Sequence, residues 1–404
     1  MTPTGQTEAP AIKRYPFTRT SPLAPAPEFD ELRTSDPVTQ VELWNGNRAW
    51  LATRYEDIRA LLHNPNLSSD TMREGFPQAN ATAASFRGGQ RVFARMDPPQ
   101  HDEHRLMLTA DFMVRHVREL RPYLDELIDH FLDEMEAAEG PVDLVKILAQ
   151  PVPANIITRL LDLPPEDSEF FLDRVNTWMS LEVEPAVSAA AGAEAIDYFD
   201  RLITSRLEST ADDLVSRLIR ERLNTGQLTR GELQHMLGLI LVGGFDTTAN
   251  MIALGTLTFI QHPDQLELLL ADPSLLPNAV EELLRYLTVA HHVAYRIAAG
   301  PIEIAGKSIS EGDGVIAPLM AANYDPEVFP SPHVFDIRRD ARGHLAFGYG
   351  VHQCLGQALA RVELQAVFGK LFQRLPNIRL AVPESELRFK DSLIYGVVAL
   401  PVEW

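Results

Sequence analysis

The feature that most constrains the fold is a long apolar segment between Gly231 and Gln261. Its start carries a capping-box pattern, in which Thr229 is followed three positions later by Glu232, and Pro263 supplies a stop just after its end. At the rise of an α-helix, such a segment of about 30 residues is about 45 Å long. Because it is apolar on most sides, we predict a single helix that runs through the core of the protein.

Apolar residues recur at helical spacing over most of the remaining chain. Helices are expected at 55–64, 104–137, 142–163, 190–223 and 354–374. Short alternating stretches predict strands within 38–54 and again after about residue 300, whereas residues 1–30 are expected to form an irregular arm. The predicted fold class is therefore mainly α with a minor β region.

The chain of 404 residues has a net charge of −20 and a single cysteine. The acidic balance argues against nucleic acid as a partner, because phosphate binding relies on basic surfaces. One cysteine cannot form an intrachain disulfide and fits a reducing compartment. The first residues lack the order of a secretion signal, and no apolar run is expected to be long enough to span a membrane. We therefore expect a cytoplasmic protein without a membrane anchor.

The lone cysteine, Cys354, lies among three glycines just before a predicted helix. Gly348 and Gly350 permit a tight turn, and Gly356 allows a flat group to approach the start of the helix. Backbone N–H groups at that start favour the thiolate form of the cysteine. Without Cys or His partners at zinc spacing, such a thiolate suits a single-ligand iron site better than zinc. The alternative is that Cys354 is simply a small buried apolar residue.

Two adjacent glycines, Gly243 and Gly244, lie in the middle of the long predicted helix and precede Asp246 and Thr247. Each glycine costs about 1 kcal/mol relative to alanine inside a helix, so the pair needs a reason. Either a large group lies against the helix there, or the backbone opens locally. The acid and the hydroxyl that follow suggest proton delivery. The alternative is close helix packing, with Thr247 bonded back to a backbone carbonyl.

The cysteine segment resembles the heme-binding signature of the cytochrome P-450 family, Phe-x-x-Gly-x-[His/Arg]-x-Cys-x-Gly. Phe347, Gly350, His352, Cys354 and Gly356 occupy its fixed positions, and the resemblance is strongest to the soluble bacterial class. It implies one cytochrome P-450 domain over residues 1–404, with the long central helix over a buried heme b (iron protoporphyrin IX). It also implies that Cys354 is the iron ligand, that Phe347 packs near it, that Gly356 contacts the cofactor, and that His352 contacts a heme propionate.

The long helix also resembles the family, whose motif [Ala/Gly]-Gly-x-[Asp/Glu]-Thr matches Gly243 to Thr247. This match implies that Thr247 stabilises bound dioxygen and that Asp246 relays protons. Gly243 stands where alanine is commoner in the family.

Further family-like positions carry basic side chains that suit heme carboxylates, since arginine binds carboxylates through two hydrogen bonds. His101 and Arg105 lie four residues apart, as in the family's His-x-x-x-Arg element. Arg296 matches the arginine that follows the family's Glu-x-x-Arg helix. With His352, the resemblance therefore implies a propionate-binding set of four residues.

Glu282 and Arg285 match the Glu-x-x-Arg pair itself, which the resemblance makes structural. The family usually supplies a third, basic partner just before a position that is Phe335 here, but this chain has Val334 in that place. Neighbouring His333 is the candidate for the third partner. The alternative is that the pair closes without one.

The substrate pocket is expected to be largely apolar, which favours a hydrophobic small molecule of moderate size. His291 and His292 either bond a polar group of the substrate or face the heme edge or solvent. The segments 68–92 and 170–190 are expected beside the pocket. The individual pocket residues predicted are Phe245, Val289, His292, Val293, Leu393 and Ile394.

The resemblance implies a heme-thiolate monooxygenase that inserts one oxygen atom of O2 into its substrate by hydroxylation or epoxidation. No G-x-G-x-x-G fingerprint is present, so electrons must come from a separate ferredoxin and ferredoxin reductase. A basic patch near the cysteine face is predicted to steer the acidic ferredoxin, and the enzyme is expected to be a monomer. The residues of this patch are His104, Arg105, Arg115, His116, Arg118, Arg342 and His344.

Two other functions remain open. Early segments of the chain also resemble the fungal nitric-oxide-reductase branch of the family, but that branch lacks the acid before the threonine, and this chain retains Asp246. A non-catalytic heme-binding protein would need the thiolate but not the pair Asp246 and Thr247. The presence of both Asp246 and Thr247 therefore favours the monooxygenase over these two alternatives.

Overall fold

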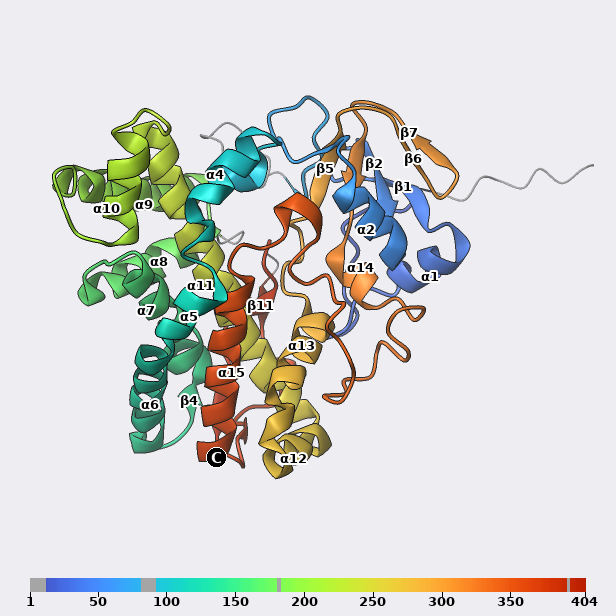
Figure 1. The fold of residues 1–404 in the computed structure, drawn as a ribbon. Helices are drawn as coiled ribbons and strands as arrows, with labels where there is room; N and C mark the ends of the chain where they lie inside the picture. The colour runs from blue at the N-terminus through green and yellow to red at the C-terminus, as the bar shows by residue number, and fades with distance from the viewer. Residues whose placement is uncertain (1–11, 81–91, 180–182, 391–392) are drawn as a thin grey trace, which may run out of the picture.

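Helix α11 (Arg230–Gln261) passes through the middle of the molecule in the computed structural model, which describes residues 12–80, 92–179, 183–390 and 393–404 (Figure 1). The predicted capping box is confirmed, because the Thr229 side chain accepts from the N–H of Glu232 and the Glu232 carboxylate accepts from the N–H of Thr229. By length and composition α11 could cross a membrane, so the expectation that no apolar run is long enough was wrong. However, 72% of its most apolar stretch is buried inside the protein, as expected of a core helix.

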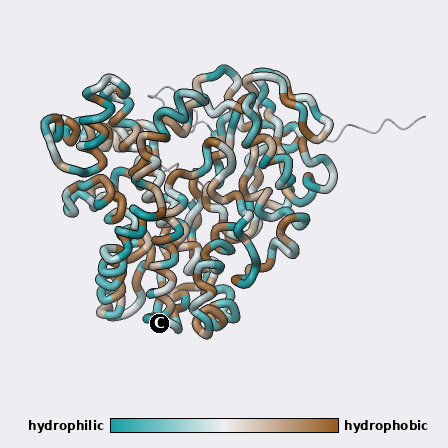
Figure 2. Tube along the Cα trace, in the orientation of Figure 1, coloured by the Kyte–Doolittle hydropathy of each residue, from teal (hydrophilic) through white to brown (hydrophobic). Residues whose placement is uncertain are grey.

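Most of the other helices pack around α11 and α15, whereas α1, α2 and α14 lie beside the main sheet (Figure 1), and hydrophobic and hydrophilic residues are mixed along the helices (Figure 2). They are α1 (Glu28–Ser35), α2 (Tyr55–His63), α4 (Gln100–Thr109), α5 (Val114–Glu119), α6 (Arg121–Ala137), α7 (Pro151–Leu160), α8 (Ser168–Met179), α9 (Pro185–Ser205), α10 (Leu214–Leu218), α12 (Pro263–Ala271), α13 (Leu276–Leu287), α14 (Leu319–Asn323) and α15 (Gln357–Arg374).

The strands form a minor component beside the helical part. The main sheet has the strand order β1-β2-β8-β5-β3, in which β2 and β8 are parallel and the other neighbours antiparallel. Its strands are β1 (Val38–Glu42), β2 (Arg48–Ala52), β3 (Leu67–Ser68), β5 (Tyr295–Ala298) and β8 (Gly314–Ile316). Smaller sheets contain β4 (Val142–Asp143), β6 (Ile302–Ile304), β7 (Lys307–Ile309), β9 (Arg379–Leu380), β10 (Phe389–Lys390), β11 (Gly396–Val397) and β12 (Pro401–Glu403).

Two hydrophobic cores reflect this division. The larger one lies among the helices around α11, and the smaller one lies on the main sheet together with the N-terminal segment. Tyr15 and Phe17 of that segment are buried in the smaller core, and the N–H of Tyr15 donates to the carbonyl of Glu42 (2.8 Å). The predicted arm is therefore irregular between residues 12 and 27 but packed, and α1 already begins within it.

Several predicted boundaries differ from the structure. The helix expected at 104–137 is three helices, α4, α5 and α6, with α6 restarting where Pro122 occupies its first turn. The helix expected at 142–163 begins as strand β4 and becomes helical after it. Helix α15 starts at Gln357, so Cys354 lies in the loop that precedes it.

Candidate active site

A cavity of about 370 Å³ lies where α11, α4, the start of α15 and the segment before β5 meet. All seven cofactor-binding residues predicted from the sequence line it. They are His101, Arg105, Arg296, Phe347, His352, Cys354 and Gly356. The first and last of these residues in the sequence, His101 and Gly356, are about 250 positions apart. The fold therefore brings distant segments of the chain to one cavity.

The loop that carries Cys354 owes its shape to glycine. Gly348 and Gly350 have φ values of 72° and 74°, a region that favours glycine. A Cβ atom on Gly350 would also lie 2.5 Å from the carbonyl oxygen of Leu62, at the end of α2. The loop closes with the N–H of Cys354 donating to the carbonyl of Phe347 (2.8 Å), which leaves the sulfur accessible to the cavity.

The surroundings of the Cys354 sulfur have opposing effects on the pKa of the thiol. Burial raises the pKa of the Cys354 thiol, while the backbone N–H of Gly356 and the positive charges of Arg105 and Arg361 lower it. The predicted contribution of backbone N–H groups at the helix start is therefore present, but burial outweighs its effect on the pKa. A metal ion at the sulfur would favour the thiolate directly.

A second layer of charged groups supports this loop and was not predicted from the sequence. The Glu281 carboxylate accepts two hydrogen bonds from Arg361 (2.6 and 3.0 Å) and lies 3.2 Å from the Nε2 atom of His344. Although burial acts in the opposite direction, His344 and Arg361 together lower the pKa of Glu281 to about 2. The Arg361 guanidinium lies over the ring of Phe347 (4.6 Å), so this network fixes the phenylalanine beside the cysteine loop.

The basic residues at the edge of the cavity lie close together, and one of them, His101, pairs through its Nδ1 atom with the Asp102 carboxylate (2.7 Å). The rings of His101 and His352 are 4.4 Å apart, and the buried His101 Nε2 and His352 Nδ1 atoms have no hydrogen-bond partner among the described residues. Burial and the nearby charge of Arg95 lower the pKa of Arg296 to about 9. Burial, Arg296, His101, Arg95 and Arg105 lower the pKa of His352 to about 3.

Unpartnered donors and crowded cations of this kind fit a ligand that carries two carboxylates. Cys354 presents its sulfur to the same cavity, and Gly243 of α11 leaves space beside it. These groups together fit a flat, iron-containing group with propionate side chains. Arg95 was not predicted from the sequence; it does not line the cavity, but its charge acts on Arg296 and His352.

The glycine pair of α11 has two different explanations in the structure. A Cβ atom on Gly244 would lie 2.2 Å from the Cδ1 atom of Ile157 in α7, whereas a Cβ atom on Gly243 would meet nothing within 4 Å. Gly244 therefore permits close helix packing, and Gly243 leaves space on the cavity side. Both residues line the cavity, and α11 is helical without interruption between them and its ends.

Thr247 and Asp246 project differently from α11. Thr247 lines the cavity and its hydroxyl donates to the carbonyl of Gly243 (2.6 Å). Asp246 is only 5% exposed and does not line the cavity; its carboxylate accepts from the side chain of Asn250 (2.8 Å). Burial raises the pKa of Asp246, while Lys390 and Asn250 lower it. The acid therefore lies behind the hydroxyl rather than beside it.

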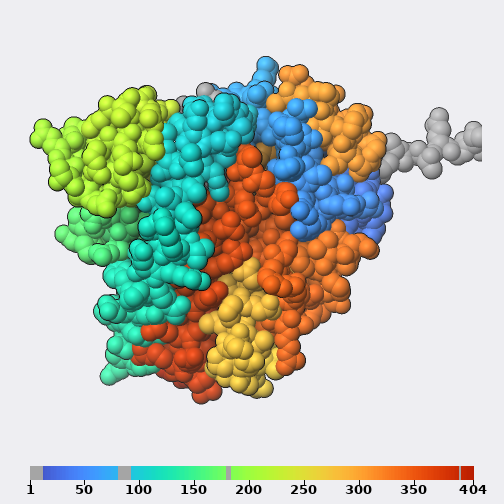
Figure 3. Space-filling model, viewed as in Figure 1, coloured from blue at the N-terminus to red at the C-terminus, as the bar shows by residue number. Residues whose placement is uncertain are grey.

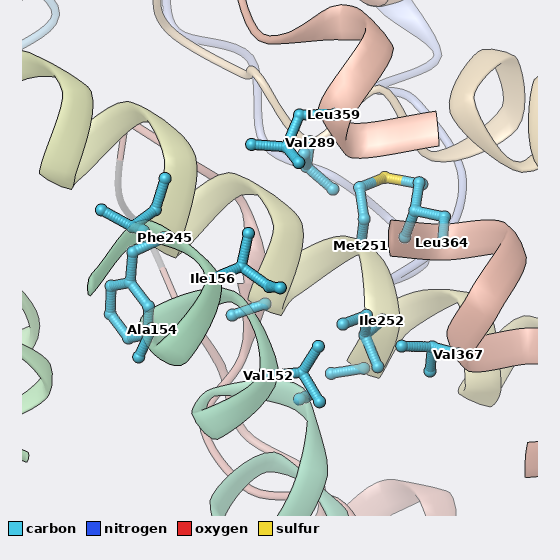
Figure 4. Packing of buried hydrophobic residues seen from close by; sticks show 14 of the residues in the cluster. Val152, Ala154, Ile156, Phe245, Met251, Ile252, Val289, Leu359, Leu364 and Val367 are labelled. Carbon is cyan, nitrogen blue, oxygen red and sulfur yellow. The ribbon is translucent and has the colours of Figure 1, made fainter. Parts of the chain in front are cut away.

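Three of the six predicted pocket residues line the cavity, namely Val289, Val293 and Ile394. Phe245 does not: it is 1% exposed and packs against α7 near Ala154 and Ile156 (Figure 4). Helical geometry explains this, because cavity-lining residues of α11 recur at 243, 244, 247, 248 and 251, and position 245 lies on another face.

His292 and Leu393 also lie behind the cavity wall. His292 is 7% exposed, stacks on His291 (4.1 Å) and has its Nδ1 atom 3.4 Å from the hydroxyl of Tyr295. Burial and the charge of Arg19 lower its pKa to about 4. The Leu393 carbonyl accepts from the N–H groups of both histidines (3.1 Å each). The prediction that His292 and Leu393 line the pocket was therefore wrong.

The two flanking segments predicted beside the pocket are only partly described. Residues 81–91 and 180–182 lie outside the described residues. Among the described residues of these segments, 68–80, 92, 170–178 and 183–190, none lines the cavity. Phe93 and Ala94, immediately after the first segment, do line it.

The Glu282–Arg285 pair has a third partner that the sequence analysis did not identify. Both side chains are fully buried and joined by two hydrogen bonds (2.7 and 2.8 Å). Arg339 donates from Nε to Glu282 (3.1 Å), whereas His333 pairs with Asp30 (2.9 Å). The expectation for His333 was therefore wrong, because the chain after Phe335 turns back and places the basic side chain four residues later.

The structure and comparisons with known proteins agree on the class of this protein. A sequence profile described as Cytochrome P450 matches residues 33–398. The chain belongs to the cytochrome P450 family and is a monooxygenase whose cofactor is heme. It is 44% identical to Cytochrome P450-SU2 of Streptomyces griseolus, over the full length of both chains.

Solved structures support the same assignment. Cytochrome P450 MoxA (CYP105) of Nonomuraea recticatena is 42% identical, with a TM-score of 0.90 over 97% of this chain and 98% of that one. Mycinamicin VIII C21 methyl hydroxylase of Micromonospora griseorubida, solved with mycinamicin VIII bound, is 37% identical, with a TM-score of 0.91 over 97% and 100% of the two chains. The predicted family and fold class, mainly α with a minor β region, are confirmed.

Proposed function

We propose that the chain is a heme-thiolate enzyme that inserts one oxygen atom of O2 into a hydrophobic small molecule, by hydroxylation or epoxidation. The observation that carries this proposal is the convergence on one cavity of the Cys354 sulfur, two histidines that each have an unpartnered ring nitrogen, two arginines, and the glycine–threonine face of α11. Heme b fits this set of groups. When bound, it supplies the activation of dioxygen, and ligation by a thiolate favours cleavage of the O–O bond.

The residues that would hold the heme have distinct tasks. Cys354 would ligate the iron through its sulfur, and Gly356 allows close approach because it adds no side chain beside that sulfur. His101, Arg105, Arg296 and His352 would bind the propionates, whose carboxylates would accept from the unpartnered ring nitrogens and from the guanidinium groups.

Two side chains of α11 would manage protons. The hydroxyl of Thr247 faces the cavity and can pass a proton to a group bound there. Asp246, one position earlier and buried behind it, would hold the replacement proton on its carboxylate. In this arrangement Asp246 stays outside the apolar cavity, although it is adjacent to Thr247 in the chain.

The cavity wall favours an apolar substrate. Val289, Val293 and Ile394, together with Leu239 and Ile240 of α11, present apolar side chains and exclude water. The similar protein that binds mycinamicin VIII is named as its C21 methyl hydroxylase, which supports hydroxylation of a small molecule by this chain as well.

Electrons would come from a separate ferredoxin and ferredoxin reductase, and the predicted docking patch needs revision. His104 and His344 are buried and do not belong to the surface, and Arg105 is partly exposed but lines the cavity. Arg115, Arg118 and Arg342 are exposed, and His116 is partly exposed. The segment before α15 reaches the surface next to the chain of α4 and α5 (Figure 3), and α5 carries Arg115, His116 and Arg118.

The same segments carry exposed apolar residues, Leu106 in α4 (73% exposed) and Val351 in the loop before α15 (47%). A surface that combines apolar and basic side chains is suited to a small acidic protein. We expect charge reversal at Arg115 or Arg342 to slow reduction by ferredoxin, and the difference from wild type to shrink as salt rises. Equal reduction rates at every salt concentration would refute this docking site.

The assigned iron ligand is tested by absorption spectroscopy. The dithionite-reduced protein with carbon monoxide is expected to show the red-shifted Soret band of a thiolate-ligated heme, and Cys354→Ala to abolish that band. His352→Ala is the matched control, because it removes a propionate contact: it should keep the band position but release heme more readily to apomyoglobin. A Cys354→Ala protein with an unchanged band would overturn the proposed site. Candidate substrates can then be screened by the spin-state shift they cause.

This proposal includes a cytoplasmic monomer built as one cytochrome P450 domain. It requires neither nucleic acid nor a membrane, since the net charge is −20 and α11 is a core helix. Sedimentation of the heme-loaded protein, which is expected to behave as a particle of 45.1 kDa plus heme, tests the oligomeric state.

A further inference from the structure

Lys390 lies close to Asp246, although the two residues come from separate parts of the fold. The Nζ atom of Lys390 is 3.7 Å from the Oδ1 atom of Asp246. Asp246 is in the middle of α11, and Lys390 is in β10, near the end of the chain. Among the described residues, Lys390 is the one charged side chain that forms an ion pair with Asp246.

A short hairpin carries Lys390 to this position. Strand β10 pairs with β11 in antiparallel register, with Lys390 opposite Gly396. Gly396 lies directly against Asn250 of α11, and a Cβ atom there would be 1.7 Å from the Asn250 Oδ1 atom. Only a glycine at position 396 lets the hairpin approach α11 this closely. Lys390, which lies opposite Gly396 in the hairpin, is then close enough to Asp246 to form an ion pair.

The same asparagine holds the acid from the side of the helix. The Asn250 Nδ2 atom donates to the Asp246 carboxylate (2.8 Å) and to the Asp246 backbone carbonyl (2.7 Å). Asn250 is 2% exposed and Asp246 is 5% exposed. The carboxylate is therefore fixed between Asn250 and Lys390, turned away from the cavity that Thr247 faces.

Lys390 also connects this buried acid to solvent. The Lys390 side chain is 23% exposed to solvent, whereas the Asp246 side chain is 7% exposed. Burial disfavours the charged form of a carboxyl group, and an adjacent cation favours it. Burial raises the pKa of Asp246, and Lys390 is the largest opposing influence, followed by the hydrogen bond from Asn250.

We propose that Lys390 is a positioning residue of the monooxygenase reaction: it holds the Asp246 carboxylate ionised and turned toward the β10–β11 hairpin, at the solvent end of the proton route to Thr247. In this arrangement a proton enters from water at the exposed side of Lys390 and binds the Asp246 carboxylate. The neutral acid no longer attracts the ammonium group and is free to turn toward the Thr247 hydroxyl. The inference rests on the proposed role of Asp246 as the proton relay.

The test compares Lys390→Met, which keeps the length of the side chain but removes its charge, with Lys390→Arg, which keeps the charge. Lys307→Met is the matched control, because Lys307 is a partly exposed lysine of β7 that forms an ion pair with Asp36 (2.9 Å) and not with a residue of α11. Lys390→Gln replaces the methionine variant if the latter does not fold, as judged by far-UV circular dichroism and heme content.

The first measurement is the infrared absorption of the protonated Asp246 carboxyl in the holoenzyme, identified by its loss in Asp246→Asn. Because the ammonium group stabilises the carboxylate, its removal should keep Asp246 protonated up to a pH about one unit or more above the wild-type value. Lys390→Arg and Lys307→Met should match the wild type. Identical titrations of Lys390→Met and wild type would overturn the inference.

The second measurement is the pH profile of oxygen consumption in H2O and D2O, with the holoenzyme reduced through a plant ferredoxin and its reductase. In Lys390→Met the profile should move to higher pH by the same amount as the infrared titration, and the solvent isotope effect should change. If Asp246→Asn consumes oxygen with the wild-type profile and isotope effect, the proposed relay itself is wrong. If Asp246→Asn is impaired and Lys390→Met is not, only the assignment of Lys390 fails.

Discussion

The two glycines in the middle of α11 are expected to differ sharply in their tolerance of a methyl group. Gly244→Ala places its Cβ atom 2.2 Å from Ile157 Cδ1 and 2.8 Å from Ile157 Cγ1, well inside ordinary contact. Gly243→Ala meets nothing within 4 Å. The two substitutions are chemically identical and adjacent in one helix, so each serves as the reference for the other.

The expected magnitude follows from two opposing contributions. Alanine is favoured over glycine inside a helix by about 1 kcal/mol at both positions. Overpacking a well-filled core costs about 1–3 kcal/mol, and Ile157 is fully buried. The helix contribution cancels in the comparison. Gly244→Ala should therefore be less stable than Gly243→Ala by about 1–3 kcal/mol.

Urea unfolding followed by far-UV circular dichroism measures this difference in the heme-loaded proteins. Ile157→Ala completes a double-mutant cycle, because it removes both atoms that would collide with the new methyl group. Alone it should destabilise the protein by about 2–5 kcal/mol, but in its presence Gly244→Ala should cost little or become stabilising. Equal stabilities of the two alanine variants, or a cycle without coupling, would refute the packing explanation for Gly244.

Two further predictions concern buried charges. Both carboxylate oxygens of Glu363, a fully buried cavity residue, have no hydrogen-bond partner among the described residues, and burial raises its pKa from 4.5 to about 8. The folded protein therefore binds this proton more tightly than the unfolded chain, so stability should fall by about 3 kcal/mol between pH 4.5 and 7, relative to Glu363→Gln, in urea unfolding across that range. A parallel pH dependence of the two proteins would contradict this reasoning. Arg339→Met should destabilise the protein by about 2 kcal/mol, because it removes a hydrogen bond to the fully buried Glu282 carboxylate, whereas His333→Ala, at an exposed ion pair, should change the urea midpoint little. Equal effects of these two variants would mean that Arg339 is not the third partner.

The sequence was informative wherever the function depends on residues close together in the chain. The cysteine segment has its glycines, histidine and cysteine within ten positions, and their spacing identified the heme-binding loop and the family. The capping box and the stop after Gln261 placed α11 to within a residue. Local patterns of this kind are set by backbone geometry over one or two turns, so they can be read without knowledge of the rest of the fold.

Only the tertiary structure decided which way the remaining side chains point and what they meet. Phe245 adjoins the acid–threonine pair in sequence, yet it packs against α7, because the cavity takes a different face of α11. Arg339, and not His333, contacts Glu282 because of a turn in the chain, and Lys390 contacts Asp246 because of the β10–β11 hairpin. Neither contact has a local sequence pattern that predicts it. Contacts between distant segments depend on how whole elements pack, and a spacing rule within one segment contains no information about that packing. The sequence by itself determined the chemistry of the site, and the packing of α11 against its neighbours determined which residues serve it.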